Sequence, residues 1–124
     1  MSQNSSKLPQ PPPGFERSDC PVSCALEILG DKWTLLVIRD LVMGKKRYGD
    51  FQASPESIPT NILAERLKRL EASGLVEKTP YQENPVRYEY SLTPAGAELR
   101  GILISVAEWA NRHIPGTRRD WRKK

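Results

Sequence analysis

The sequence predicts an α+β fold that is mainly α, in which several helices precede a two-stranded hairpin and one long helix follows it. Three observations support this prediction. Apolar residues recur at helical spacing in most of the chain from Val22 to His113. Residues 75–81 and 86–92 alternate instead with the period of a strand. Glycine or proline follows several of these segments, where helices and strands commonly end.

The 124-residue chain is long enough for one domain with a tail. We expect a disordered arm over residues 1–18, because a polar stretch rich in proline cannot support a core. The domain then covers residues 19–114, and residues 115–124 form a basic tail. The sequence has no apolar run long enough to span a membrane and no secretory signal at its start. A cytoplasmic protein without membrane contact is therefore expected.

The formal charge of +4 comes entirely from the end of the chain, where residues 118–124 hold five basic groups and one acid. Residues 1–117 carry 14 basic and 14 acidic side chains, so net charge alone does not argue for a nucleic-acid partner. A local cluster argues better, since residues 45–69 contain six basic groups and three acids. An ordinary solvated surface remains the alternative for that cluster.

Two helices are predicted in the first part of the domain. Val22–Leu29 suits a short helix that ends at Gly30. Asp31 is expected to cap the next helix, Lys32–Met43, because its carboxylate can accept the first free N–H groups. That helix has apolar groups on nearly every side, which predicts burial between neighbours, and Gly44 ends it.

A basic turn at residues 45–47 precedes a weak helix that Tyr48 and Phe51 anchor. Residues 54–57 form a turn, and Ser57 or Thr60 is expected to cap the following helix.

The segment Ile58–Gly74 is the most informative part of the sequence. Leu63, Leu67 and Leu70 form one apolar stripe at helical spacing. Side chains that can bond phosphates and base edges stand between them: Asn61, Glu65, Arg66, Lys68 and Arg69. Such a helix followed by a two-stranded ribbon is how winged helix-turn-helix proteins read DNA. We therefore predict this fold, with the hairpin as its wing and residues 83–85 at the tip.

The last helix begins at Thr93, with Pro94 in the first helical position, and runs to about His113. Its apolar surface is wider than a core-facing stripe, which predicts packing on a second subunit. The alternative is that this surface folds back over the chain's own core. The residues expected to form the dimer are Leu99, Ile102, Leu103, Val106, Trp109 and Ala110.

The sequence offers little for a metal, a cofactor or catalysis. Cys20 and Cys24 lie four residues apart, which matches neither a zinc framework nor a CxxC redox motif. The single histidine, His113, cannot complete a metal site. Because a phosphate-binding glycine loop and a nucleophile–base–acid set are also missing, we expect no metal, no cofactor and no enzymatic activity.

Five short motifs occur in order along residues 19–114: Cys20–Val22, Gly30–Thr34, Leu63–Leu67, Gly74–Val76 and Tyr90–Gly96. Together they closely resemble the HxlR-type family of bacterial winged helix-turn-helix transcriptional regulators, within the MarR-like superfamily. The combination of Gly-Asp-Lys-Trp-Thr with Tyr-Ser-Leu-Thr-Pro is specific, whereas each piece alone is weak.

The resemblance implies a homodimer whose flanking helices make the dimer. Two recognition helices would enter successive major grooves of a near-palindromic operator in double-stranded DNA. A cytoplasmic, nucleoid-associated, sequence-specific regulator of transcription is thus implied. The DNA-binding residues that follow from the resemblance and from phosphate chemistry are Lys45, Lys46, Arg47, Thr60, Asn61, Glu65, Arg66, Lys68, Arg69 and Arg87. Gly49, where the family has better helix formers, predicts a short supporting helix.

Alternatives stay open for several of these residues and for the function. Arg66 could pair with an acid such as Glu71 or Asp50 instead of binding DNA. Glu65 is expected to be an i,i+4 partner of Arg69 more than a base reader. The alternative function is a winged-helix protein-interaction module without specific DNA binding.

Several members of the family sense oxidants or electrophiles through a cysteine at the place of Cys20. Pro21 puts Cys20 at about the N-cap of the first helix, and a thiol at a helix start can react as a thiolate. Redox sensing by Cys20 is one hypothesis and an inert thiol is the other. An oxidant or small-molecule effector is therefore left open, while Cys24 is expected to pack as a small hydrophobe.

Overall fold

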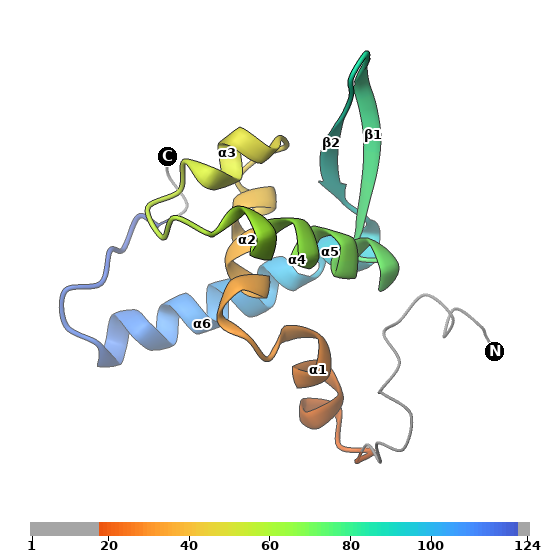
Figure 1. The fold of residues 1–124 in the computed structure, drawn as a ribbon. Helices are drawn as coiled ribbons and strands as arrows, with labels where there is room; N and C mark the ends of the chain where they lie inside the picture. The colour runs from red at the N-terminus through yellow and green to blue at the C-terminus, as the bar shows by residue number, and fades with distance from the viewer. Residues whose placement is uncertain (1–17, 122–124) are drawn as a thin grey trace.

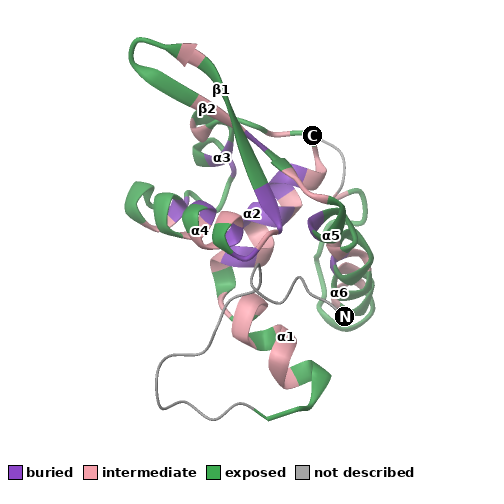
Figure 2. Cartoon of the chain, turned by 90° about the vertical axis from the view of Figure 1, so that its right-hand side faces the viewer, coloured by how far each residue is buried: buried purple, intermediate pink, exposed green. Residues whose placement is uncertain are grey.

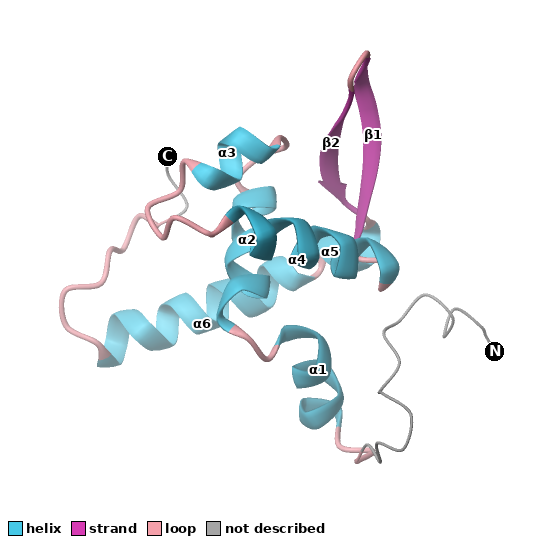
Figure 3. Ribbon diagram, in the orientation of Figure 1, coloured by secondary structure: helices cyan, strands magenta, loops and turns pink. Residues whose placement is uncertain are grey.

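The computed structural model describes residues 18–121, which form a mainly helical domain with one antiparallel hairpin (Figures 1 and 3). This confirms the predicted fold class. Residues 1–17 of the predicted arm (residues 1–18) and the last three residues of the basic tail lie outside the described residues. The elements in chain order are α1 (Pro21–Leu29), α2 (Lys32–Val42), α3 (Tyr48–Gln52), α4 (Thr60–Ala72), β1 (Val76–Glu83), β2 (Val86–Leu92), α5 (Pro94–Ala97) and α6 (Leu99–His113).

Helix ends follow the predicted caps in most places. The Asp31 carboxylate accepts hydrogen bonds from the backbone N–H groups of Trp33 and Thr34, at 2.9 and 3.1 Å. Gly44 ends α2 with a φ of +93°, a conformation that side-chain-bearing residues rarely adopt. The Thr93 hydroxyl accepts a hydrogen bond from the Gly96 N–H at 3.1 Å and caps α5.

The predicted cap of α4 is wrong. Pro59 occupies the N-cap position, and no side chain caps the helix. Thr60 is already the first helical residue, and its hydroxyl accepts a hydrogen bond from the Gln52 side chain at 2.9 Å. Ser57 adopts a φ of 56° in the preceding turn. The helix thus starts two residues later than a Ser57 cap would place it and one residue earlier than a Thr60 cap would.

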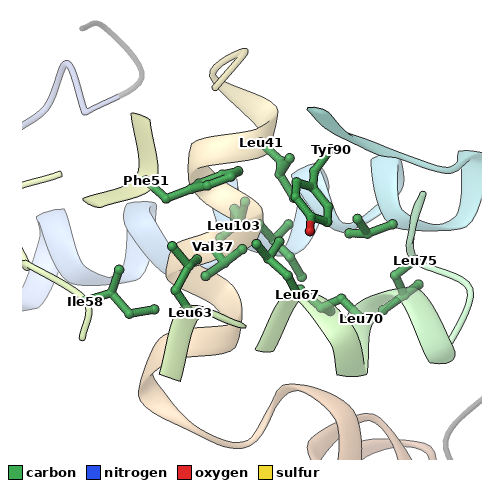
Figure 4. Packing of buried hydrophobic residues seen from close by; sticks show 12 residues of the cluster. Val37, Leu41, Phe51, Ile58, Leu63, Leu67, Leu70, Leu75, Tyr90 and Leu103 are labelled. Carbon is green, nitrogen blue, oxygen red and sulfur yellow. The ribbon is translucent and has the colours of Figure 1, made fainter. Parts of the chain in front are cut away.

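The core lies where α2 crosses α4 and α6 (Figure 4). The predicted stripe of Leu63, Leu67 and Leu70 is fully buried there, against Val37 and Ile38 of α2. Phe51 of α3, Tyr90 of β2 and Leu103 of α6 complete this core from other elements. Figure 2 shows that burial is concentrated at this crossing, whereas most of the hairpin is exposed. The core therefore fixes the orientation of α4 and leaves its opposite face in solvent.

The predicted long helix after Thr93 is two helices, α5 and α6, with Glu98 between them. Gly96 explains the position of α5. A Cβ at residue 96 would lie 2.1 Å from the carbonyl oxygen of Leu75, so the α5 backbone packs directly on the start of the hairpin. Glu98 keeps helical backbone angles, with a φ of −67° and a ψ of −18°, and α6 packs on α2.

The hairpin projects away from the helices (Figure 1). Its strands pair in antiparallel register, with Val76 opposite Leu92 and Glu83 opposite Val86. An irregularity between Pro80 and Gln82 shifts the register and falls at Tyr81. The base of β2 is fixed by a hydrogen bond from the Tyr90 N–H to the carbonyl of Lys46, at 2.9 Å.

Within residues 18–121, none of the helices combines the length and apolar character of a membrane-spanning segment. The same residues contain no group of three or more His, Cys, Asp or Glu side chains that could hold a metal ion.

Candidate nucleic-acid interface

The outer face of α4, defined here by Asn61, Glu65 and Lys68, points away from the core. These residues follow one another at spacings of four and three, which places them on one line of the helix. All three are exposed, and the buried leucines lie on the opposite side. The wing follows α4 after a short turn at Ser73–Leu75 (Figure 1). A helix held in this way can enter a groove while the hairpin lies beside it.

Arg66 and Arg69 are engaged within the chain. The Arg66 Nε donates to Asp31 Oδ1 at 3.1 Å, and its Nη1 contacts the Glu65 carboxylate. Arg69 pairs with Glu65 at 3.2 Å, which confirms the predicted i,i+4 pair, and lies 3.4 Å from Asp31 Oδ2. An internal pair for Arg66 was one alternative from the sequence, with Glu71 or Asp50 as examples of the acid. The structure gives Arg66 two other acidic partners, the adjacent Glu65 and Asp31, which is 35 residues away in sequence.

The carboxylates of this cluster are held in their charged form. Burial disfavours the charge on Asp31, but hydrogen bonds from Thr34 and Arg66 outweigh it and lower its pKa to about 2. Burial also opposes the charge on Glu65, yet Arg66 and Arg69 lower the pKa of that group too. The two carboxylates and two arginines therefore compensate one another, and Lys68 has no ion-pair partner within residues 18–121.

The three basic residues before α3 have different surroundings. The Lys45 ammonium donates to the Ser54 hydroxyl at 2.6 Å and is half-buried, whereas Lys46 is exposed. Arg47 pairs with Glu89 at 2.9 Å and stacks on the ring of Tyr81. Lys45 and Arg47 thus have contacts inside the fold, and both Lys46 and Arg47 are exposed.

Arg87 is exposed on β2, beside a small cleft that tyrosines from α3 and both strands line. Lys78 on β1, a residue that the sequence prediction missed, lies over the Tyr88 ring at 4.5 Å and 3.7 Å from Glu71. Its position in a strand of alternating polar residues close to the end of α4 was the available signal. The wing therefore presents two cations, of which Lys78 also contacts α4.

The residues proposed for a dimer divide into two groups. Ile102, Val106 and Trp109 expose 42%, 53% and 55% of their surface. Leu103 is buried in the core of its own chain, so we leave it out of the dimer surface. Leu99 and Ala110 are half-buried. Val22 and Leu26 of α1, which were not predicted as dimer residues, are also exposed.

Cys20 is exposed at the N-cap of α1, as predicted. Its backbone N–H donates to the Ser18 hydroxyl at 2.9 Å. Cys24 is half-buried one turn later, and its thiol donates to the Ser18 carbonyl at 3.4 Å. The two thiols thus differ in access to solvent.

Known proteins share this arrangement. The model of the HxlR-like helix-turn-helix family matches residues 28–118. An HTH-type transcriptional regulator of Mycobacterium tuberculosis is 37% identical over 94 residues, which are 76% of this chain and 59% of that protein. The chain thus spans less than two thirds of the length of this mycobacterial relative. The HTH-type regulator YybR of Bacillus subtilis is 35% identical over 79% of this chain and 80% of its own length.

Solved structures agree with these relatives. The redox regulator HypR in its reduced form superposes with a TM-score of 0.71 and 33% identity, covering 77% of this chain and 95% of HypR. The match of the family model to most of the chain, the two relatives and the shared winged fold lead to one conclusion: the chain belongs to the HxlR-like helix-turn-helix family of transcriptional regulators.

Proposed function

We propose that this protein is a homodimeric regulator that binds a near-palindromic operator in double-stranded DNA. The observation that carries the proposal is the outer face of α4, which the leucine stripe orients to solvent next to an extended wing. Asn61 and Lys68 supply groups for base edges and phosphates, and Arg87 and Lys78 supply phosphate contacts from the wing. In winged-helix DNA binding, a helix likewise contacts base edges while a hairpin contacts the phosphate backbone.

The exposed apolar residues of α6 and α1 support the homodimer. Ile102, Val106 and Trp109 on α6 and Val22 and Leu26 on α1 each leave a large apolar side chain in solvent. Surfaces of this kind usually pack against another protein. A two-fold dimer would present two α4 helices to DNA, and half-sites one helical turn apart would then mirror its symmetry.

An oxidant response through Cys20 is part of the proposal. The exposed position of this thiol at the start of α1 supports it, because an oxidant in solvent can reach it directly. The similarity to HypR, a redox regulator by name, supports it as well. The effector would be an oxidant or an electrophile that reaches the thiol directly.

Selection of binding sites from random duplexes tests the DNA-binding function. The full chain should enrich a near-palindromic sequence, and a gel shift at moderate salt should show preference for that sequence over random DNA. If no sequence is bound above random DNA, the regulator proposal fails. A winged-helix module that contacts proteins instead of DNA would then be the better description.

A further inference from the structure

The carboxylate of Asp31 joins the N-terminus of α2 to the recognition helix α4. It caps α2, and it also accepts hydrogen bonds from Arg66 and Arg69. We propose that Asp31 is a positioning residue that holds both arginines beside α2, so that base readout falls to Asn61 and Lys68. The inference rests on the proposed DNA-binding function and specifies how the same helix would recognise a sequence.

The Asp31 carboxylate is saturated with hydrogen-bond donors. Its Oδ1 accepts from two backbone N–H groups and from the Arg66 Nε. Its Oδ2 accepts from the Thr34 hydroxyl at 2.7 Å and from the Arg69 Nη1 at 3.4 Å. If the arginines left, the carboxylate would lose its charged partners. The arginines and the α2 cap therefore form one connected unit.

Arg66 does not lie on the outer face of α4. At 100° per residue, Arg66 lies about 100° around α4 from Glu65, about 140° from Asn61 and about 160° from Lys68. Its side chain is only 17% exposed, against 37% for Arg69. Arg66 thus points along the flank of α4 toward α2. To reach a base it would have to break both its contact to Asp31 and its contact to Glu65.

On the outer face of α4, Glu65 is paired with arginines, whereas Asn61 and Lys68 are not engaged in side-chain contacts among residues 18–121. Glu65 is held by Arg66 and Arg69, so its carboxylate oxygens are already occupied by donors. Asn61 and Lys68 are exposed, and within residues 18–121 neither has a side-chain hydrogen bond or ion pair. The amide of Asn61 offers the donor–acceptor pair that matches adenine, and the Lys68 ammonium can bond guanine acceptors. These two side chains are free to read bases without breaking internal contacts.

The Asp31→Asn variant tests the positioning role. Asparagine keeps a side-chain oxygen for the α2 cap, so the variant should stay folded, with a lower melting temperature because the charge that holds the arginines is lost. The released arginines should bind phosphates. We expect tighter binding to random duplexes, a plot of log K against log salt steeper by about one to two, and a lower ratio of operator to random affinity. Fluorescence anisotropy with both duplexes at several salt concentrations measures these quantities.

Binding-site selection with Asn61→Ala and Arg66→Ala tests which residues read bases. Asn61→Ala should lose the preference at one base pair in each half-site and bind the wild-type operator roughly tenfold more weakly. Arg66→Ala should select the same consensus as the wild type. Lys68→Ala should lose a base preference at a different position. Circular dichroism of each variant checks that it is folded before selection.

The outcomes separate this inference from the proposed function. If the wild type enriches no consensus, DNA recognition itself is refuted. A wild-type consensus with an unchanged affinity ratio and salt slope in Asp31→Asn overturns the positioning role alone. A lost consensus position in Arg66→Ala overturns the assignment of readout to Asn61 and Lys68.

Discussion

The guanidinium of Arg47 lies 3.7 Å from the centroid of the Tyr81 ring, and this contact joins the start of α3 to the wing. Arg47 also pairs with Glu89 on the second strand at 2.9 Å. The neighbouring carbonyl of Lys46 accepts a hydrogen bond from the Tyr90 N–H. The turn before α3 therefore contacts a side chain on each strand and the backbone of β2. The basic turn therefore sets the angle at which the wing leaves the domain.

Removal of Arg47 should loosen the wing without unfolding the domain. In Arg47→Ala, amide hydrogens near the Tyr81 irregularity should exchange faster, because the stacking and ion-pair contacts to the hairpin are gone. A double-mutant cycle with Tyr81→Leu should give a coupling of about 0.5–1 kcal/mol, as expected for an exposed cation–π pair. Additive effects of the two substitutions would show that the contact contributes nothing. Arg87→Ala, on the same hairpin, is the control that should leave exchange unchanged.

Arg87→Ala should instead weaken binding to every DNA sequence about equally. Arg87 is exposed on the wing, and in the proposed complex we expect its guanidinium to contact phosphates and not base edges. The slope of log K against log salt should become shallower by about one. Titration of operator and random duplexes at several salt concentrations measures this. A loss confined to the operator would assign Arg87 a base contact.

The local features of the fold could be predicted from sequence because they depend on neighbouring residues. The Asp31 cap, the left-handed Gly44 and the Thr93 cap each act within a few residues, and all three are confirmed. The leucine stripe of α4 was also readable, since helical spacing alone decides which side is buried.

The sequence predictions that the structure corrects depend on contacts between segments that are far apart in the chain. The break between α5 and α6 accompanies the packing of Gly96 on the Leu75 carbonyl. The spacing of apolar residues along the sequence does not reveal that contact. Arg66 pairs with Asp31, which is 35 residues away in sequence, so neither of the acids named from the sequence, Glu71 or Asp50, identified this pair. Burial of Leu103 within its own chain likewise depends on how α6 crosses α2. Side-chain roles at the site thus required tertiary geometry.

Acid should weaken the ion pair between Arg39 of α2 and Glu56 in the turn before α4. Arg39 binds both oxygens of Glu56, at 2.8 and 2.9 Å, and its hydrogen bonds lower the pKa of Glu56 to about 2. A carboxylate whose pKa is depressed on folding stabilises the protein above its unfolded pKa and loses that effect as pH falls toward the folded value. The contribution of Glu56 should therefore be complete above about pH 4.5 and vanish near pH 2.

Glu56→Gln isolates this contribution. Urea unfolding should show a loss of about 1 kcal/mol at pH 7, because the pair is partly exposed and solvent screens it. The difference between variant and wild type should shrink between pH 4 and pH 2. Asp31 titrates in the same window, so some acid sensitivity should persist in the variant. A difference that stays constant with pH would remove Glu56 from the acid response.

Val106→Asp should dissociate the proposed dimer while the subunit stays folded. Val106 leaves 53% of its surface in solvent, so a charge there does not disturb the core, but it opposes burial at an apolar interface. Sedimentation velocity should show the wild type as a dimer and the variant as a monomer with weaker operator binding. Leu103→Ala is the matched contrast: it should cost about 2–5 kcal/mol of subunit stability because Leu103 is in the core. A monomeric wild type would contradict the dimer.

Oxidation should release DNA through Cys20 and not through Cys24. With hydrogen peroxide as the probe, the Cys20 thiol would attack one oxygen, form a sulfenic acid and release water. Cys20 is exposed at the start of α1, and this helix carries Val22 and Leu26 on the proposed dimer surface. A polar oxidised sulfur at that point would act on α1 packing, and so on the spacing of the two α4 helices, without touching DNA.

The two serine variants separate the thiols. Cys24→Ser should still lose operator affinity on peroxide treatment and regain it with dithiothreitol, because Cys24 is half-buried and hydrogen-bonded to the Ser18 carbonyl. Cys20→Ser should keep its affinity under the same treatment. Gel shifts with reduced, oxidised and re-reduced protein make the comparison, and mass spectrometry locates the added oxygen. Release of DNA by oxidised Cys20→Ser would place the sensor elsewhere in the chain, since α1 would then carry no oxidisable group at its N-cap.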